Sequence, residues 1–96
     1  MKQYRHGDLL IMEVPLCPKG TLLDHRILAH GEATGHAHRV DERAELREQD
    51  GQLFLRVSQE TRLTHEEHAT ITLPQGYYRV VRQREYTPAS PRYVED

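Results

Sequence analysis

The sequence lacks tryptophan and has little else from which a large apolar core could be built. Among its 96 residues it has one phenylalanine and one cysteine, and aromatic residues make up only 6%. The single cysteine, Cys17, excludes an intrachain disulfide and a cysteine-based zinc site. No segment approaches the ~20 consecutive apolar residues of a membrane-spanning helix, and no apolar leader opens the chain. We therefore expect a cytoplasmic protein with no membrane partner.

The length of the chain limits the core that it can form. A chain of this size buries only about 60–65% of the surface that it exposes when unfolded, and apolar residues make up 36% of the sequence. These values predict one domain over residues 1–86, followed by a tail over residues 87–96 that carries two prolines. A core this modest also favours a homodimer, in which a second copy covers part of the surface.

The charge of the chain argues against a strongly basic nucleic-acid binder. The net charge is −2, and phosphate contacts need clustered cationic side chains. The cations are nevertheless 11 arginines against 2 lysines. Because the planar guanidinium group suits phosphate and carboxylate, a small-molecule or nucleotide/RNA phosphodiester substrate stays open.

Apolar and polar residues alternate with a period of two along most of the chain, which is the pattern of half-buried strands. The turn signal is strongest at Asp50-Gly51, because a type I′ hairpin turn needs a positive φ at both positions. The expected strands cover residues 9–14, 26–30, 45–49, 52–57, 62–65, 70–73 and 77–86. Short strands at regular spacing predict an all-β, single-domain antiparallel barrel or sandwich, such as a β-roll.

Seven histidines in 96 residues are the first indication of chemistry. His36 and His38 stand two positions apart, and side chains at i and i+2 of a strand point to the same face. Two imidazoles placed in this way can both bind one divalent metal ion. Gly31 and Gly35 precede the pair and allow a sharp bend or the close approach of a ligand.

A second histidine segment, His-Glu-Glu-His, begins at His65 and ends at His68. It is one residue shorter than the His-Glu-x-x-His motif of zinc proteases. We expect the third ligand of the metal site to come from His65, His68 or Glu42. His6 and His25 stand apart from both segments, and we expect them on strand surfaces.

The residues His36-Ala37-His38, followed after three residues by Glu42, are similar to the first metal motif of the cupin barrels. Pro74-Gln75-Gly76 resembles the Pro-x-Gly of the second cupin motif. The resemblance implies a small β-barrel whose lumen holds Mn, Fe, Ni or Zn through two histidines, a glutamate and a further histidine. The chain departs from the family pattern at Arg79, where the second motif has histidine, and at His30, where the first has glycine.

The last expected strand places an unusual mixture of side chains on one face. The residues that share this face are Tyr78, Val80, Arg82, Arg84 and Tyr86. Guanidinium groups cannot be buried without partners, because an uncompensated buried charge costs several kcal/mol. We therefore expect this face to meet water, an acidic partner or an anionic ligand. Glu66 and Glu67, which precede the neighbouring strand, are the expected acidic partners.

The first functional hypothesis is a metal-dependent hydrolase that acts on phosphodiesters. Its metal ligands would be His36, His38, His65 and His68. The divalent ion, Zn²⁺ or Mn²⁺, would lower the pKa of a bound water toward ~7 and polarise the phosphoryl oxygen. Glu32 or Glu66 would act as general base. An arginine of the last strand, Arg82 or Arg84, would hold the phosphate.

Two alternatives come from different classes of function. One is a metal-free ribonuclease, in which His36 and one of His38, His65 or His68 serve as general base and acid, since the unperturbed pKa of histidine is near 6.5. The other is a non-enzymatic module that binds a metal or a small ligand. A chelator distinguishes the first two hypotheses, because only the metal-dependent enzyme would lose its activity.

Overall fold

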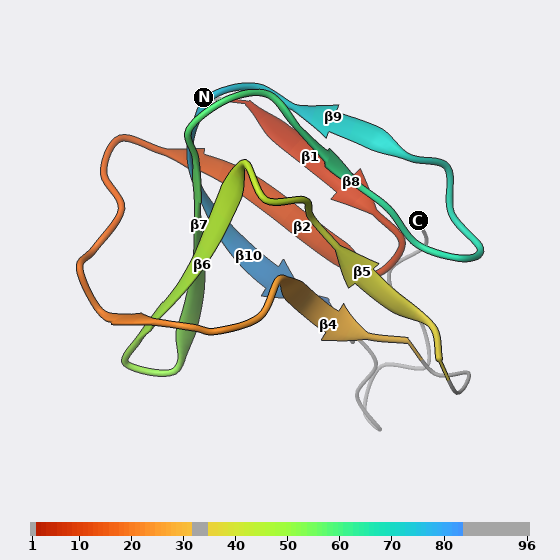
Figure 1. The fold of residues 1–96 in the computed structure, drawn as a ribbon, viewed down its shortest axis with the longest axis horizontal. Coiled ribbons are helices and arrows are strands. Elements are labelled where there is room, and N and C mark those ends of the chain that lie inside the picture. The colour runs from red at the N-terminus through yellow and green to blue at the C-terminus, as the bar shows by residue number, and fades with distance from the viewer. Residues whose placement is uncertain (1, 32–34, 84–96) are drawn as a thin grey trace, which may run out of the picture.

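The computed structural model describes residues 2–31 and 35–83, and over these residues the chain is an all-β single domain of antiparallel sheets (Figure 1). The class predicted from the sequence is therefore confirmed. The strands are β1 (Gln3–His6), β2 (Leu9–Val14), β3 (Thr21–Leu22), β4 (Ile27–His30), β5 (Ala37–Arg39), β6 (Ala44–Gln49), β7 (Gln52–Val57), β8 (Thr61–Leu63), β9 (Ile71–Leu73) and β10 (Gly76–Arg82). In the part of the chain described, no helix is long and apolar enough to cross a membrane.

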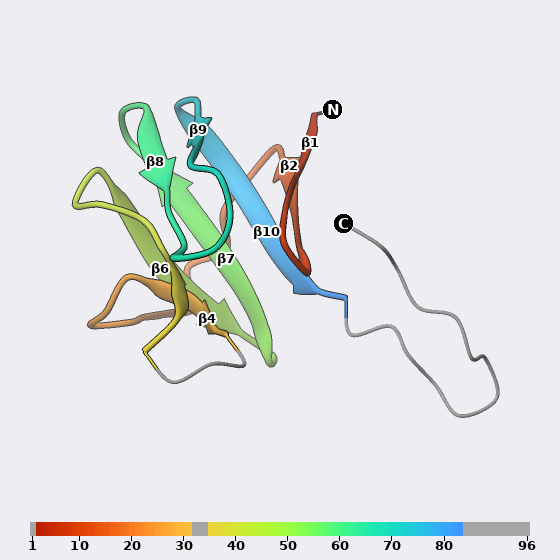
Figure 2. The same ribbon diagram turned by 90° about the vertical axis from the view of Figure 1, so that its right-hand side faces the viewer.

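Six of these strands form the main sheet, in the order β1-β2-β10-β7-β6-β3. The hairpins β4–β5 and β8–β9 form two further small sheets. An isolated bridge between Arg39 and Thr64 links them, with backbone hydrogen bonds of 3.0 and 2.8 Å in the two directions. Figures 1 and 2 show both hairpins lying over one face of the main sheet. Among the described residues the sheets do not close into a barrel. Of the two expected architectures, barrel and sandwich, the observed fold is therefore the layered one.

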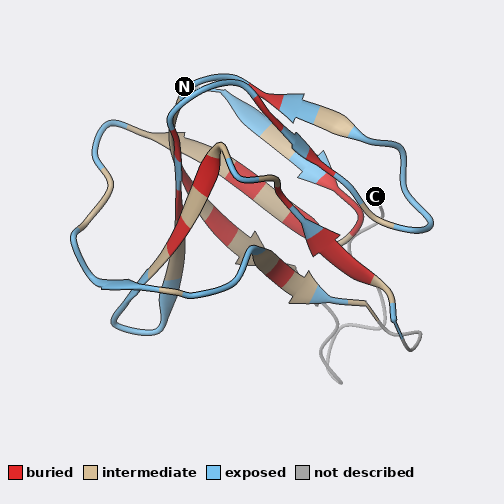
Figure 3. Cartoon of the chain, in the orientation of Figure 1, coloured by how far each residue is buried: buried red, intermediate tan, exposed pale blue. Residues whose placement is uncertain are grey.

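The core lies between the main sheet and the two hairpins (Figure 3). Its buried members come from both layers: Leu9, Ile11, Leu28, Val40, Ala44, Leu46, Leu55, Val57, Leu63, Leu73, Tyr78 and Val80. In β2, β6 and β7 the buried residues alternate with more exposed ones, as the period of two predicts. The residues between them, on the other face of the main sheet, are partly or fully exposed.

The hairpin β6–β7 follows the local prediction closely. Asp50 and Gly51 have φ values of 53° and 76°, the two positive values that a type I′ turn requires. This turn fixes the register, so that Leu46 stands opposite Leu55. Both leucines are fully buried, and a shift of one residue would turn them toward water.

The face of β10 corrects one expectation from the sequence. Tyr78 and Val80 belong to the core, so this face does not meet water along its length. The hydroxyl of Tyr78 donates a 2.6 Å hydrogen bond to the carbonyl of Pro74, which satisfies the buried phenol. Among the described residues of this face only Arg82, at the end of the strand, needs an acidic partner, and that partner is Asp8 rather than Glu66 or Glu67. The remaining predicted residues of this strand, 84–86, lie outside the described residues.

Candidate metal centre

Three segments that are distant in the sequence bring histidines to one end of the hairpin layer. They are the end of β1 with the following Gly7-Asp8 turn, the residues that enter β5, and the loop between β8 and β9. The Arg39–Thr64 bridge sets β5 beside β8, so the side chains before and within β5 meet those of the loop after β8. As a result, rings from all three segments contact one another.

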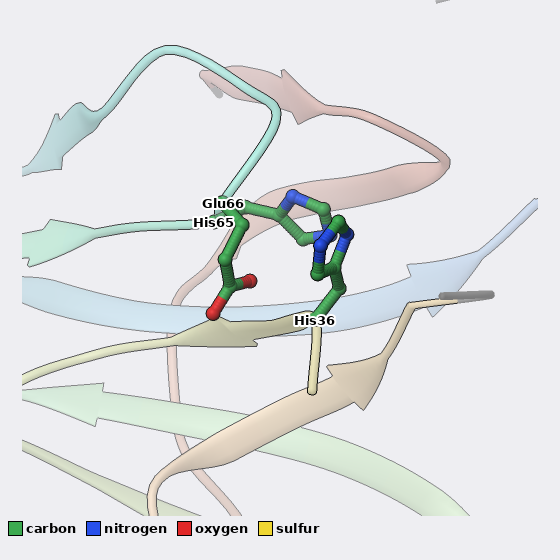
Figure 4. Close-up of side chains that lie close together, drawn as sticks. All are labelled: His36, His65 and Glu66. Carbon is green, nitrogen blue, oxygen red and sulfur yellow. The ribbon is translucent and has the colours of Figure 1, made fainter. Parts of the chain in front are cut away.

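His36, His65 and Glu66 form the part of this cluster nearest the surface. One ligand atom of each lies within 4.8 Å of those of the other two, so the group could hold a metal ion. Figure 4 shows the imidazole of His65 directed at that of His36, while the carboxylate of Glu66 turns toward β5. Two imidazoles and one carboxylate are a ligand set that catalytic zinc sites use. We call this group the outer site.

Glu66 is held in place by β5. Its Oε1 accepts a 2.9 Å hydrogen bond from the backbone N–H of Ala37, and its Oε2 accepts one of 2.9 Å from Nη1 of Arg39. The N–H of Ala37 and then the Arg39 guanidinium lower the pKa of this carboxyl to about 2. Glu66 is therefore ionised at neutral pH. Each carboxylate oxygen has two acceptor positions, so one remains for a cation.

Glu67 contacts both histidines of the outer site. Its Oε2 lies 3.4 Å from Nδ1 of His36, an arrangement in which a carboxylate orients an imidazole and leaves Nε2 free for a metal. Its backbone N–H donates a 2.9 Å hydrogen bond to Nδ1 of His65. Neutral His65 thus carries its proton on Nε2. To bind a metal, it must either break the hydrogen bond at Nδ1 or lose the proton from Nε2.

A second group, His6 with His38, lies behind the outer site and is almost completely buried. The two Nδ1 atoms are 2.8 Å apart, and Nε2 of His6 lies 3.0 Å from the carbonyl oxygen of Ala69. Nε2 of His38 lies 3.5 Å from Oδ1 of Asp8. Burial, followed by the neighbouring His6, lowers the pKa of His38 to about 4, and burial lowers the pKa of His6 as well. Both rings are therefore neutral at pH 7.

Comparison with protein families assigns the chain without assigning a function. Residues 5–83 match the family described as Domain of unknown function (DUF8820). The chain belongs to this family. No curated protein and no solved structure matches it. The family match does not identify a cupin, and Glu42, which the cupin pattern would use as a ligand, is exposed in the turn before β6 and outside the outer site.

The domain gathers all four histidines proposed as ligands but divides them between different partners. His36 contacts His65, whereas His38 contacts His6, His65 and His68. The ring centroids of His65 and His68 are 4.5 Å apart, so His65 connects the two groups.

Two residues of the cluster escaped the sequence reasoning. His6 was expected on a strand surface. That expectation is wrong, because only 3% of this residue is exposed. Asp8 was not considered at all, although it is a carboxylate two residues after a histidine, a spacing that could have drawn attention to it. His25, the other expected surface histidine, is exposed.

Arg82, one of the two arginines predicted to bind phosphate, has partners within this domain. Nε of Arg82 donates a 2.7 Å hydrogen bond to Oδ2 of Asp8, and Nη2 donates one of 2.6 Å to the carbonyl of His30. Arg82 therefore reaches the histidine cluster through Asp8 and holds that carboxylate in place. Glu32 and Arg84, the other sequence-based candidates, lie outside the described residues.

Proposed function

We propose that this domain binds a divalent transition-metal ion at the outer site, with His36, His65 and Glu66 as ligands. The observation that supports this is the convergence of their ligand atoms within 4.8 Å from two separate segments. Three protein ligands leave a fourth position for water, as in catalytic zinc sites. Imidazole suits Zn²⁺ and carboxylate also suits Mn²⁺, so these two ions fit the ligand set.

The free energy lost when His65 rearranges to bind a metal is small beside the free energy that metal binding contributes. Breaking its exposed hydrogen bond to the N–H of Glu67 costs about 0.5–1.5 kcal/mol. Zinc bound to structural sites in small domains contributes about 10–16 kcal/mol at neutral pH. His36 needs no such rearrangement, because Glu67 already faces its Nδ1. The site is thus partly organised before the ion arrives.

Isothermal titration of the chelator-treated protein with ZnCl₂ tests the proposal. We expect His36→Ala to weaken binding at the outer site at least tenfold, because one of three ligands is lost. Glu66→Gln should have a similar effect. His25→Ala is the matched control, since His25 is exposed and outside the cluster, and it should bind as the wild type does. Unchanged binding in both His36→Ala and Glu66→Gln would exclude the outer site.

We propose hydrolysis of a phosphodiester as the chemical use of this ion, and a specific neighbour favours it. Arg39, whose side chain is 45% exposed, stands 2.9 Å from Glu66, so its guanidinium lies beside the metal position and faces solvent. A phosphate bound to the ion could therefore contact Arg39, whereas Arg82 is occupied by Asp8. With Glu66 as a ligand, the general-base role passes to Glu67, whose carboxylate faces His36.

Hydrolysis of bis(p-nitrophenyl) phosphate in the presence of Zn²⁺ or Mn²⁺ tests this use. A chelator should abolish turnover, and Arg39→Ala should reduce it at least tenfold, with Arg62→Ala as a control on an exposed arginine. Cleavage of RNA that survives the chelator would instead support the metal-free ribonuclease, whose nucleophile, the ribose 2′-hydroxyl, is missing from bis(p-nitrophenyl) phosphate. No activity with an intact metal site would leave a metal-binding module, and the hydrolase proposal would fail.

A further inference from the structure

The buried histidine pair fixes the positions of its own protons. The carbonyl of Ala69 can only accept a hydrogen bond, so Nε2 of His6, at 3.0 Å, must be the donor. A neutral imidazole has one N–H, so Nδ1 of His6 is an acceptor. Nδ1 of His38 lies 2.8 Å from it and must therefore donate. The proton of His38 is thus on Nδ1.

This assignment leaves Nε2 of His38 with a free lone pair directed at a carboxylate. Oδ1 of Asp8 lies 3.5 Å away, so two acceptors face each other without a proton between them. The other oxygen of Asp8 is held by Nε of Arg82 at 2.7 Å, which keeps the carboxylate in this orientation. A cation bound to both atoms at about 2.0–2.2 Å, with a tetrahedral angle, would hold them about 3.4 Å apart. The observed separation fits that requirement.

His68 stands where a third ligand is needed. A Cβ atom added to Gly7 would lie 2.5 Å from Nε2 of His68 and 3.1 Å from Cε1 of His38, so both rings lie over this glycine. The two rings are stacked, with centroids 5.8 Å apart and planes 15° apart. His68 is exposed, so rotation about its side-chain bonds can bring Nε2 toward the His38–Asp8 pair. Gly7 leaves the space that this requires.

We propose that Asp8, His38 and His68 form a second site for a divalent transition-metal ion, which we call the inner site. It shares no ligand with the outer site and does not depend on it. Its key imidazole is already in the tautomer that binds metal and donates its other N–H to a neighbour, as metal-bound histidines usually do. The ring of His65, 4.4 Å from that of His38 and 5.6 Å from that of His36, separates the two sites, so the ions would be neighbours.

Native mass spectrometry of the chelator-stripped protein, titrated with ZnCl₂, tests the inner site by stoichiometry. We expect two ions for the wild type and one for Asp8→Asn. Asp8→Asn also alters the contact with Arg82, so a second variant is needed. His68→Ala changes an exposed residue and removes no buried group. It should bind one ion tightly. Asp24→Asn, at an exposed aspartate, should keep both.

The outcomes separate the inner site from the outer site. One ion that is lost in Asp8→Asn and His68→Ala but kept in His36→Ala would support the inner site and exclude the outer one. One ion with the opposite pattern would exclude the inner site alone. Two ions in wild type that both persist in Asp8→Asn and His68→Ala would also overturn the inner site, and so would a wild type that binds none.

Discussion

At the scale of single residues, His6 shows why burial could not be predicted from the sequence. It lies in the four-residue strand Gln3–His6, in which no apolar alternation marks an inward face. The local pattern therefore predicts that a histidine in such a segment lies on the surface. Its burial depends on His38, which lies 32 positions away in the sequence, and on the carbonyl of Ala69. Those contacts come from tertiary packing that no local pattern records.

The protonation of the two buried rings is a prediction at this scale. We expect metal-free protein at pH 7 to carry the proton of His6 on Nε2 and that of His38 on Nδ1, because the carbonyl of Ala69 orders the chain of hydrogen bonds. Long-range ¹H–¹⁵N correlation spectra distinguish the two tautomers directly. His25, which accepts a hydrogen bond from the N–H of Ile27 at Nδ1, serves as an internal reference. The reverse assignment for His38 would contradict the hydrogen-bond chain.

At the scale of elements, the strands that the sequence predicts best are those with nearby partners. The hairpin β6–β7 needs only its own turn and alternation, and its bounds are found almost to the residue. By contrast, β1 and β3 escaped prediction, because β1 is nearly polar and β3 has only two residues. β10 was found as a strand, but its buried face was misread because Arg82 shares that face with Tyr78 and Val80.

The turn between β5 and β6 gives a prediction about pH. Asp41 accepts hydrogen bonds from the N–H of Arg43 at 2.9 Å, from Nη2 of Arg43 at 2.7 Å, and from the hydroxyl of Thr61 at 2.6 Å. The Arg43 side chain first, and then Thr61, lower the pKa of this carboxyl far below its usual range. A carboxyl with a depressed folded pKa stabilises the protein above its unfolded pKa of about 3.9, and this contribution is lost as pH falls below it.

We therefore expect Asp41→Asn to lower the free energy of unfolding by about 1 kcal/mol at pH 7, a value reduced for solvent screening. The difference from wild type should shrink as the pH falls from about 4 toward 2, because the unfolded chain then binds a proton at this carboxyl while the folded protein, with its lowered pKa, does not. Urea unfolding at pH 7 and pH 3 measures both effects. Asp24→Asn, at an exposed aspartate, should change stability at neither pH. A penalty for Asp41→Asn that is equal at both pH values would contradict this account.

At the scale of the whole molecule, the sequence predicted the content of the cluster better than its geometry. The spacing of His36 and His38 was taken to direct both at one ion. In the structure His36 precedes β5 and turns to His65, whereas His38 lies within β5 and turns to His6. The difference arises from the packing of β5 against β8 and β1, which alternation alone does not specify. The homodimer expected from the sequence stays a prediction, and the exposed side chains of Leu16 and Leu22 are apolar surface that a second copy would cover.

The last prediction concerns how a bound metal affects the stability of the domain. The ligands of the outer site come from the segments before β5 and after β8, which belong to different hairpins, so an ion there joins two parts of the fold. An ion present at 100 times its dissociation constant adds about 2.7 kcal/mol to the free energy of unfolding. In a domain of this size, 1 kcal/mol raises Tm by about 4–8 °C. We therefore expect saturating Zn²⁺ to raise Tm by about 10 °C or more.

Differential scanning calorimetry with and without Zn²⁺ measures this shift, and excess chelator should reverse it. The double variant His36→Ala with Asp8→Asn removes one ligand from each proposed site and should show little response to the ion. His25→Ala should respond as the wild type does, because an exposed histidine outside the cluster joins no elements together. An equal rise of Tm in the double variant would mean that Zn²⁺ stabilises the domain from another position, and no rise in the wild type would mean that the native cluster binds it no better than the unfolded chain does.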